Sequence, residues 1–271
     1  MSRVEVAELR DVHEFEAMAL VFESVWERSS QPLVTTELLR ALSHAGNYVA
    51  GARADGSLVG GLVGFWGRHD GDWCLHSHML GVAPRAQAHG IGFRLKEHQR
   101  GWAMEHGVAT VYWTFDPLVR RNAYFNLSKL GAEAVEYHVD FYGSMVDSIN
   151  GDDETDRILV SWRLDSERVA AAATGSLPEA DVESLRDRGA QVALAADEAG
   201  HPARYPASGD VILCEVPPDI VGLRHTRPER AREWRLALRE TLGGALREGG
   251  IVRSMTRSGW YVVERDRGGA A

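Results

Sequence analysis

Apolar positions first follow the spacing of helices and then that of strands. Val12, Phe15 and Phe22 belong to a helical pattern that predicts a helix over 11–26, and a shorter helix is expected over 35–44. Asp-Gly pairs at 55–56 and 70–71 separate the next apolar runs, which is typical of hairpins. The strands expected around these turns are 48–53, 58–66 and 73–82.

After Pro84 the pattern alternates between helices and strands. The expected elements are a helix over 91–106, a strand over 108–115, a helix over 119–129 and strands over 132–141 and 157–164. A strand-helix-strand-helix section inside an otherwise antiparallel run predicts an α/β (α+β) fold. Its sheet should be mixed, mostly antiparallel and twisted, with helices on its faces, over residues 1–165.

The rest of the chain has a different composition. Residues 166–209 are rich in Ala, Gly, Asp and Glu and predict a loop-rich connector with one helix near 179–188. Residues 210–271 predict a strand, an amphipathic helix over 230–246 and a final hairpin. A β-α-β-β extension of about 60 residues is too small to be stable alone, so we expect it to pack on the first domain.

Composition and charge exclude several classes of protein. With 44% hydrophobic and 25% charged residues the chain is expected to be globular, and its two cysteines cannot form a disulfide scaffold. A net charge of −9 argues against a nucleic-acid partner. No apolar run is long enough to cross a membrane, and the first ten residues do not resemble a signal peptide, so a cytoplasmic location is expected.

The segment over 80–92 predicts an anion site. A strand ends, a loop containing Gly90 follows, and a helix begins at once. The first N–H groups of a helix lack acceptors and carry a partial positive charge, and a glycine lets phosphate oxygens approach the backbone. The glycine spacing fits neither a Walker loop nor a dinucleotide-binding fingerprint. We therefore expect a pyrophosphate to bind here in another way.

The pattern Gln87-x-x-Gly90-x-Gly92, preceded by Val82-x-Pro84, resembles the GNAT superfamily of acyl-CoA-dependent N-acyltransferases. Together with the element order, the resemblance covers about residues 1–165 and implies a GNAT-like sheet. It implies that the loop amides hold the CoA pyrophosphate and that the preceding strand pairs with pantetheine. Arg85 is either a phosphate partner or a solvated loop arginine. The cofactor-binding residues implied are Leu80, Val82, Gln87, Ala88, His89, Gly90, Ile91 and Gly92.

A second segment, 122–131, also resembles the superfamily, with one departure. The tyrosine that commonly returns a proton to the CoA thiolate is replaced by Leu127. The acid is therefore unassigned, with Tyr124 and Ser128 as substitutes, and helix packing is the alternative role for Tyr124. The resemblance makes Asn126 a contact to the cofactor arm.

Amine acylation needs a group that accepts the proton of the amine. The resemblance points to the strand before the loop, where strand alternation places His76 and His78 on one face. Histidine titrates near neutrality and suits the role, although a buried histidine pair is the structural alternative. Asp116, at the end of the next strand, is a competing carboxylate. No third ligand accompanies the His-x-His pair, so no metal is expected.

A finer resemblance concerns the substrate. Segments such as 75–79, 113–118 and 155–157 are similar to a GNAT subfamily with a C-terminal extension, sometimes associated with N-acylamino-acid racemases. It implies transfer of an acetyl or succinyl group from acetyl-CoA or succinyl-CoA to a small, amino-acid-like amine. The alternatives are a non-catalytic acyl-CoA-binding module and a protein N-acetyltransferase. Arginines 224, 227 and 230 could clamp a substrate carboxylate, or their helix could stabilise a homodimer.

Overall fold

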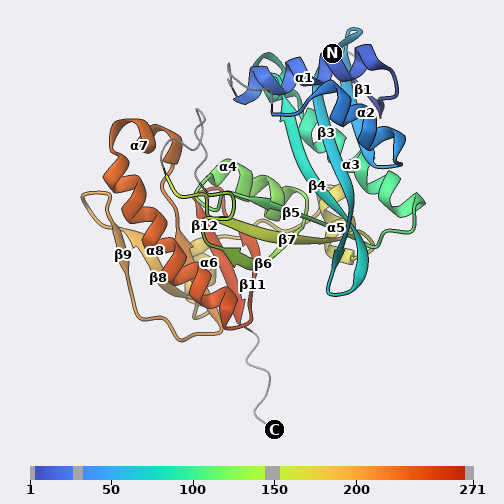
Figure 1. Ribbon diagram of the computed structural model, residues 1–271. Coiled ribbons are helices and arrows are strands. Elements are labelled where there is room, and N and C mark those ends of the chain that lie inside the picture. The colour runs from blue at the N-terminus through green and yellow to red at the C-terminus, as the bar shows by residue number, and fades with distance from the viewer. Residues whose placement is uncertain (1–3, 27–32, 144–152, 266–271) are drawn as a thin grey trace. The chain divides into compact units, whose positions relative to one another are not determined.

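The computed structural model describes residues 4–26, 33–143 and 153–265 (Figure 1). The chain forms two compact units, Met1–Trp113 and Thr114–Ala271. The sequence placed a domain boundary near residue 165 instead. The division lies earlier because the strands after residue 130 pair with one another and with the C-terminal strands.

The first unit is a sheet with the order β1-β2-β3-β4-β5. Neighbouring strands are antiparallel except for the parallel pair β4 and β5. The sequence missed β1, whose alternating exposure along Val-Glu-Val-Ala-Glu is that of a half-buried strand. The bounds are β1 (Val4–Glu8), β2 (Tyr48–Ala54), β3 (Ser57–His69), β4 (Asp72–Val82) and β5 (Thr110–Phe115), the last of which runs into the second unit.

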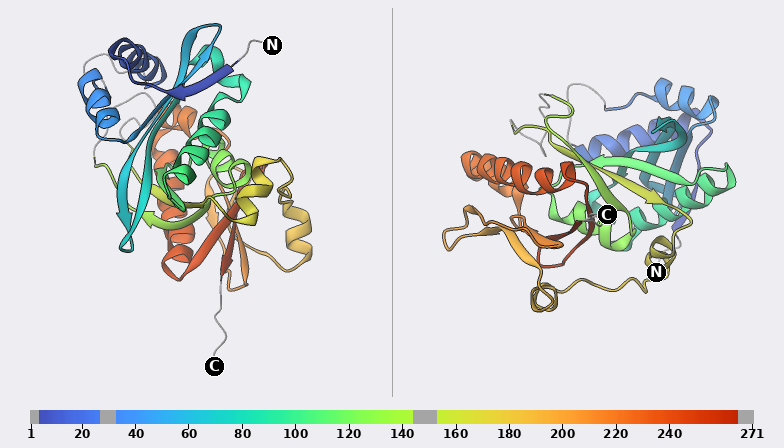
Figure 2. Two further views of the ribbon diagram at one scale, coloured as in Figure 1. Left: turned by 90° about the vertical axis from the view of Figure 1, so that its right-hand side faces the viewer. Right: turned by 90° about the horizontal axis from the view of Figure 1, so that it is seen from below.

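Helices cover both faces of this sheet (Figure 2, left). The predicted helices are α1 (Val12–Trp26), α2 (Thr36–His44) and α3 (Ile91–Glu105). A Cβ on Gly61 of β3 would meet Met18 of α1, whereas one on Gly60 would meet Ile91 and Leu95 of α3. Since successive strand residues point to opposite faces, α1 and α3 pack on opposite sides, and the glycines let both helices approach closely.

The second unit has the strand order β7-β6-β11-β12-β10-β8-β9. The pairs are antiparallel except for β10 and β8. Val252 of β11 opposes Ala134 of β6, so the C-terminal hairpin extends the sheet that β6 and β7 begin. The bounds are β6 (Glu133–His138), β7 (Arg157–Arg163), β8 (Gln191–Ala196), β9 (Pro202–Arg204), β10 (Val211–Glu215), β11 (Gly250–Met255) and β12 (Trp260–Arg265).

A long helix, α8 (Pro228–Arg247), packs along these strands. Its predicted apolar face is confirmed, because Trp234, Leu238, Leu242 and Leu246 are all buried. The predicted helix over 119–129 consists of α4 (Arg120–Ala123) and a wider π-helical segment, η2 (Tyr124–Lys129). The remaining helices are α5 (Glu167–Ala173), α6 (Val182–Asp187) and α7 (Ile220–Thr226).

The predicted fold class is confirmed, since mostly antiparallel sheets are flanked by helices in both units. The segment over 166–209 contains the helix expected near 179–188, which is α6, and three elements that were not expected, α5, β8 and β9. These elements are short and packed through small residues such as Ala172 and Ala193. Periodicity of large apolar residues could not reveal them.

Candidate functional site

The glycine loop has the geometry of an anion site. Residues 84–89 form a short 3₁₀ turn, η1, and Gly90 then takes a left-handed conformation (φ +68°) that joins it to α3. No side chain caps α3, and its first backbone bond runs from Arg94 N to Gly90 O. The N–H groups of the first three residues of α3 therefore have no acceptor within the helix. Nothing lies within 4 Å of where a Cβ on Gly90 would be.

The loop is tied to the end of β4. Gln87 donates through Nε2 to the carbonyl oxygen of Val82 (3.2 Å), and Ala83 N donates to Val59 O (2.8 Å). Leu80 and Val82 are half-buried, while His89 is exposed. The predicted CoA residues of the strand and the loop are thus held together in the first unit.

Strand β4 separates from β5 before it reaches the loop. The parallel register is Leu75 opposite Val111 and His76 opposite Tyr112, and the pairing stops there. On its other edge β4 has a bulge: Met79 opposes Val63 and Ser77 opposes Gly64, so His78 is the extra residue. We call the divergence of the two strands beyond His76 and Tyr112 the fork.

His76 and His78 lie on one side of β4, as the sequence predicted. The ring of Phe65 is 5.0 Å from that of His76 and 5.6 Å from that of His78, centroid to centroid. Burial, and then the charges of His78 and Lys96, lower the pKa of His76 to about 4. Burial also lowers the pKa of His78, although its side chain is exposed to solvent on one side. Both rings are therefore neutral near pH 7.

A buried lysine that the sequence analysis missed lies beside these histidines. Lys96 of α3 is 3% exposed and donates to Ser77 Oγ (2.9 Å) and Gln99 Oε1 (3.2 Å). Its Nζ is 3.5 Å from the ring centroid of Trp113. Burial lowers the pKa of Lys96 well below its ordinary value. The sequence did contain one indication of this burial, since Lys96 follows Leu95, which is on the buried face of α3.

Asp116 lies in the second unit, where two arginines bind it. Arg235 of α8 donates to both of its oxygens (3.0 and 3.2 Å), and Arg224 of α7 donates to Oδ2. Both arginines also bind Asp153, at 2.7 and 3.0 Å. The side chains of Asp116, Arg224 and Arg235 are 6%, 3% and 1% exposed. We call these four residues the ion-pair cluster.

The ion-pair cluster does not fit two expectations from the sequence, namely Asp116 as a base and the arginines as a substrate clamp. Burial alone would raise the pKa of Asp116, but the charges of Arg235 and Arg224 outweigh it and hold that pKa below the ordinary range. A carboxylate so stabilised is a poor proton acceptor, so Asp116 does not fit the base. Arg224 and Arg230 do not fit a substrate clamp, because Arg224 binds Asp116 and Arg230 binds His201 and Ala199 O.

The second predicted cofactor segment also lies in the second unit. Tyr124 donates to Glu179 Oε1 (3.0 Å), and burial together with this carboxylate raises the pKa of the phenol. Asn126 is 5% exposed, and its side chain has no hydrogen-bond partner within the described ranges. The hydroxyl of Ser128 donates to Met255 O (2.7 Å) and accepts from Met255 N (3.1 Å), so it holds β11 in place. Leu127 is fully buried, so nothing replaces the missing tyrosine at its own position.

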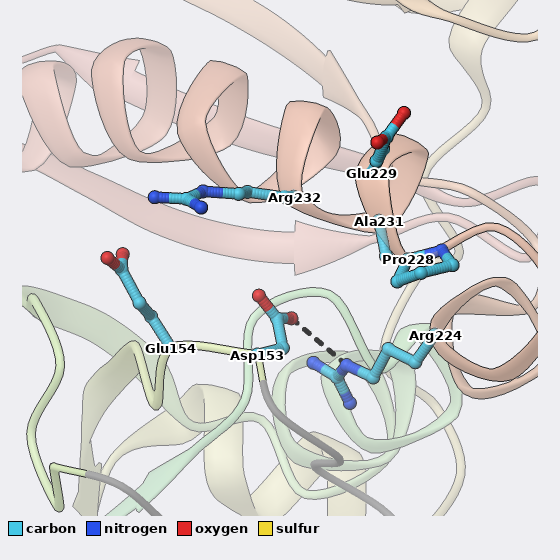
Figure 3. Close-up of a pocket in the computed structure, with 7 residues that line it drawn as sticks. All are labelled: Asp153, Glu154, Arg224, Pro228, Glu229, Ala231 and Arg232. Carbon is cyan, nitrogen blue, oxygen red and sulfur yellow. Dashed lines mark hydrogen bonds and ion pairs between the residues drawn. The ribbon is translucent and has the colours of Figure 1, made fainter.

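A cavity of about 610 Å³ opens at the start of α8 in the same unit (Figure 3). Arg224, Asp153 and Glu154 line one side, and the first turn of α8 supplies Arg232 and Glu229. The Arg232 guanidinium faces the carboxylates of Asp153 and Glu154, while Glu229 points away. Volumes of this order are typical of small-molecule sites.

Residues 4–26, 33–143 and 153–265 contain no cluster of three His, Cys, Asp or Glu side chains arranged to hold a metal ion. None of their helices combines the length and apolar character needed to cross a bilayer.

Residues 11–131 match the family model described as the acetyltransferase (GNAT) family. These residues contain the glycine loop, the fork and both histidines, and they extend through η2. Over this segment the chain is similar to the acetyltransferase (GNAT) family. The match ends at Gly131, so most of the second unit lies outside it. No curated protein matches the sequence significantly.

Several solved structures resemble part of this chain. The ribosomal-protein-S18-alanine N-acetyltransferase of Escherichia coli is 15% identical, covers 60% of this chain and 96% of its own, and has a TM-score of 0.49. An N-acetyltransferase from Staphylococcus aureus Mu50 is 14% identical over 60% of this chain and 99% of its own (TM-score 0.49). An aminoglycoside acetyltransferase from a soil metagenome, in complex with sisomicin, is 24% identical over 42% and 78% (TM-score 0.38). At these values none of them indicates which amine this chain acylates.

Proposed function

We propose that this protein transfers an acyl group from acyl-CoA to the primary amine of a small, amino-acid-like molecule. The observation that carries the proposal is the match of residues 11–131 to the acetyltransferase family, over a segment that holds both the anion loop and the fork. Acetyl-CoA is the first donor to test, and succinyl-CoA is the second.

The residues of the first unit suit an acyl-CoA as substrate. The uncapped start of α3 and the open space beside Gly90 suit a pyrophosphate, which needs donors and close backbone approach. Beyond the fork, β4 no longer pairs with β5, so its residues Met79 to Val82 can bond the amides of the pantetheine arm as an added strand would. Asn126, which the resemblance makes a contact to the cofactor arm, lies in the second unit with its amide buried.

Direct attack by the amine requires a proton acceptor and, for the leaving thiolate, a proton donor. His76 is assigned as the acceptor on its position, because it is the last residue of β4 that pairs with β5, at the base of the fork. Its lowered pKa keeps the ring unprotonated at neutral pH but makes it a weaker base than an ordinary histidine. His78 is the alternative acceptor. Tyr124, in the second unit, stays the candidate donor that the sequence suggested, and its hydroxyl donates to Glu179. The carbonyl carbon forms a bond to the amine nitrogen and loses its bond to sulfur, which leaves as CoA.

Within the second unit, the cavity at the start of α8 is the candidate site for a small molecule that carries a carboxylate. Arg232 is exposed and makes no ion pair or hydrogen bond with the described residues, so its planar guanidinium can bind a substrate carboxylate. Glu154 is partly neutralised by Arg239. A cavity of this size fits a free amino acid or a similar molecule better than it fits a folded protein.

The decisive experiment measures CoA release with a thiol reagent over a panel of free amino acids, other small amines and peptides, with acetyl-CoA and succinyl-CoA as donors. Release that depends on a small amine supports the proposal, and mass spectrometry of the amide identifies the product. Release with peptides alone would favour a protein N-acetyltransferase. CoA binding in calorimetry without release from any amine would favour a non-catalytic module.

A further inference from the structure

The point at which β4 and β5 diverge is held by one buried amine. The strands pair as far as His76 and Tyr112, so Ser77 and Trp113 are the first residues of the two arms of the fork. Lys96 donates to Ser77 Oγ at 2.9 Å, and its Nζ lies 3.5 Å from the ring centroid of Trp113. A single side chain of α3 therefore contacts both arms where they separate.

The surroundings of Lys96 hold its amine in place. Lys96 is 3% exposed and also donates to Gln99 Oε1, one turn further along α3. Gln99 is fully buried, and within the described ranges its Nε2 has no hydrogen-bond partner. This nitrogen is 3.1 Å from where a Cβ on Gly64 would lie. The amide keeps its oxygen toward Lys96 and its NH₂ in the space that Gly64 leaves open.

The buried amine of Lys96 and the buried NH₂ of Gln99 both lower the stability of the fold. Burying an amine disfavours its charged form, and a buried NH₂ without an acceptor adds a further penalty. An apolar side chain at position 96 would pack between α3 and the sheet without the cost of the buried amine. The polar contacts of Lys96 meet at the fork, which is where the proposed function places the reacting thioester.

We propose that Lys96 is a positioning residue for acyl transfer, which holds Ser77 and Trp113 at the separation that a thioester needs between the arms of the fork. The inference rests on the proposed function, in which the acyl-CoA arm enters this fork. Lys96 is six residues after Gly90, about 9 Å along α3, but its amine contacts Ser77, which is five residues before Val82 on β4. Lys96 should therefore govern the rate of transfer and have little influence on the affinity for CoA.

Two variants remove the contact from opposite ends, and a third is a matched control. Lys96→Met keeps the length of the side chain without its donors, and Ser77→Ala removes the acceptor. Arg100→Met removes a positive charge from the same helix one turn later, where Arg100 is paired with Glu97. Each variant is checked by circular dichroism and thermal unfolding, and then kcat and the Kd for acetyl-CoA are measured separately.

We expect Lys96→Met and Ser77→Ala each to lower kcat at least about tenfold, because small displacements of reacting groups can cost about 10²-fold in rate. The Kd for acetyl-CoA should stay within about threefold of wild type. The double variant should be no slower than the slower single variant, since both changes break one contact. Arg100→Met should leave kcat unchanged. If Lys96→Met does not fold, Ser77→Ala, which removes only one oxygen atom, decides the matter.

A spectroscopic measurement does not require the acceptor to be known. The chain has two lysines, Lys96 and Lys129, so protein labelled with ¹⁵N at the lysine side chains gives two signals, and Lys96→Met assigns them. Acetyl-CoA should shift the Lys96 signal by more than CoA alone does, because only the thioester adds an acyl group at the fork. Equal shifts from the two ligands would contradict the inference.

The outcomes separate the inference from the proposed function. A wild-type protein that neither binds CoA nor releases thiol would overturn the proposed function. An active wild type with an undiminished kcat in Lys96→Met and Ser77→Ala would overturn only the role of Lys96. A parallel loss of acetyl-CoA affinity and kcat would also overturn it, since that pattern indicates collapse of the whole fork.

Discussion

Arg235 and Asp116 are 119 residues apart in the chain and bind each other through two hydrogen bonds, of 3.0 and 3.2 Å, in the interior of the second unit. Arg235 is 1% exposed, and it also binds Asp153 at 2.7 Å. The pair links the end of β5 to α8. Because both charges are buried, each depends on the other for its stability.

Asp116→Asn should therefore destabilise the protein more than it alters catalysis. The change leaves Arg224 and Arg235 with Asp153 as their only acidic partner in the ion-pair cluster, and breaking a buried pair costs about 3–5 kcal/mol. Urea unfolding measures the loss. Asp187→Asn, on an exposed residue at the end of α6, is the control and should change stability by less than about 0.5 kcal/mol. A fully stable but inactive Asp116→Asn protein would restore the carboxylate as a base candidate.

Gly90→Val should weaken acyl-CoA binding at least tenfold, or about 1.4 kcal/mol. Valine disfavours the left-handed conformation at φ +68° and places methyl groups where phosphate oxygens would approach. Calorimetry measures the affinity. Gly71→Val is a matched control, because Gly71 also has a positive φ (+89°) with open space, but lies in the turn between β3 and β4. Equal effects of the two changes on affinity would show that backbone strain alone is responsible.

His76→Ala should lower kcat by roughly 10²-fold, the usual scale for a positioned base, without changing the Kd for CoA. His78→Ala is the natural comparison, because its ring lies on the same side of β4, 6.1 Å from that of His76. Steady-state kinetics with the best amine gives both values. If His78→Ala is damaging and His76→Ala is silent, the base is misassigned.

Stability should fall as the pH is lowered from 7 to 5, partly through His76. The folded pKa is about 4, below the unfolded value near 6.5, so the unfolded chain binds more protons in this interval. Stability is therefore fully present above about pH 6.5 and is lost as the pH falls toward 4. Urea unfolding of His76→Asn should show a smaller loss than wild type, by up to about 2 kcal/mol. Identical pH dependence in the two proteins would contradict the lowered pKa.

Arg232→Ala should raise the KM for the amine at least about tenfold while leaving the Kd for acetyl-CoA unchanged. The effect should be confined to acceptors that carry a carboxylate, since the guanidinium is expected to bind that group. Comparing an amino acid with its amide in kinetic assays tests this directly. Arg186→Ala, on an exposed arginine of α6, is the control. A loss that is the same for both acceptors would rule out carboxylate binding by Arg232.

The sequence predicted the elements that repeat a strong local pattern. The helical spacing of Phe15 and Phe22, and the Asp-Gly turns before Ser57 and Asp72, were sufficient to place α1 and the β2–β3–β4 meander. The glycine loop between β4 and α3 was predicted because the residues that indicate it follow one another in the chain. The division of the chain was not, since it depends on the pairing of Val252 with Ala134, which no local pattern reveals.

Side-chain partnerships between distant segments were equally hidden. The sequence suggested Arg224 as part of a substrate clamp and gave no role to Arg235, and only the structure reveals that both bind Asp116. In the sequence, nothing distinguishes Lys96 from the other polar residues of α3. Its burial follows from Ser77 and Trp113, which lie 19 and 17 residues away on different strands.

The pairing of β11 with β6 also has a consequence for the order in which the chain folds. Contacts of the first unit up to Trp113 can form while the remainder is still being synthesised. In the second unit, Ala134 cannot pair until Val252 has been synthesised, and Asp116 cannot form its ion pair until Arg235 has been synthesised. Loops of more than a hundred residues must therefore close before these contacts form. Until then β6 presents an unpaired edge, and a ribosome that stalls between these points would expose it to other chains.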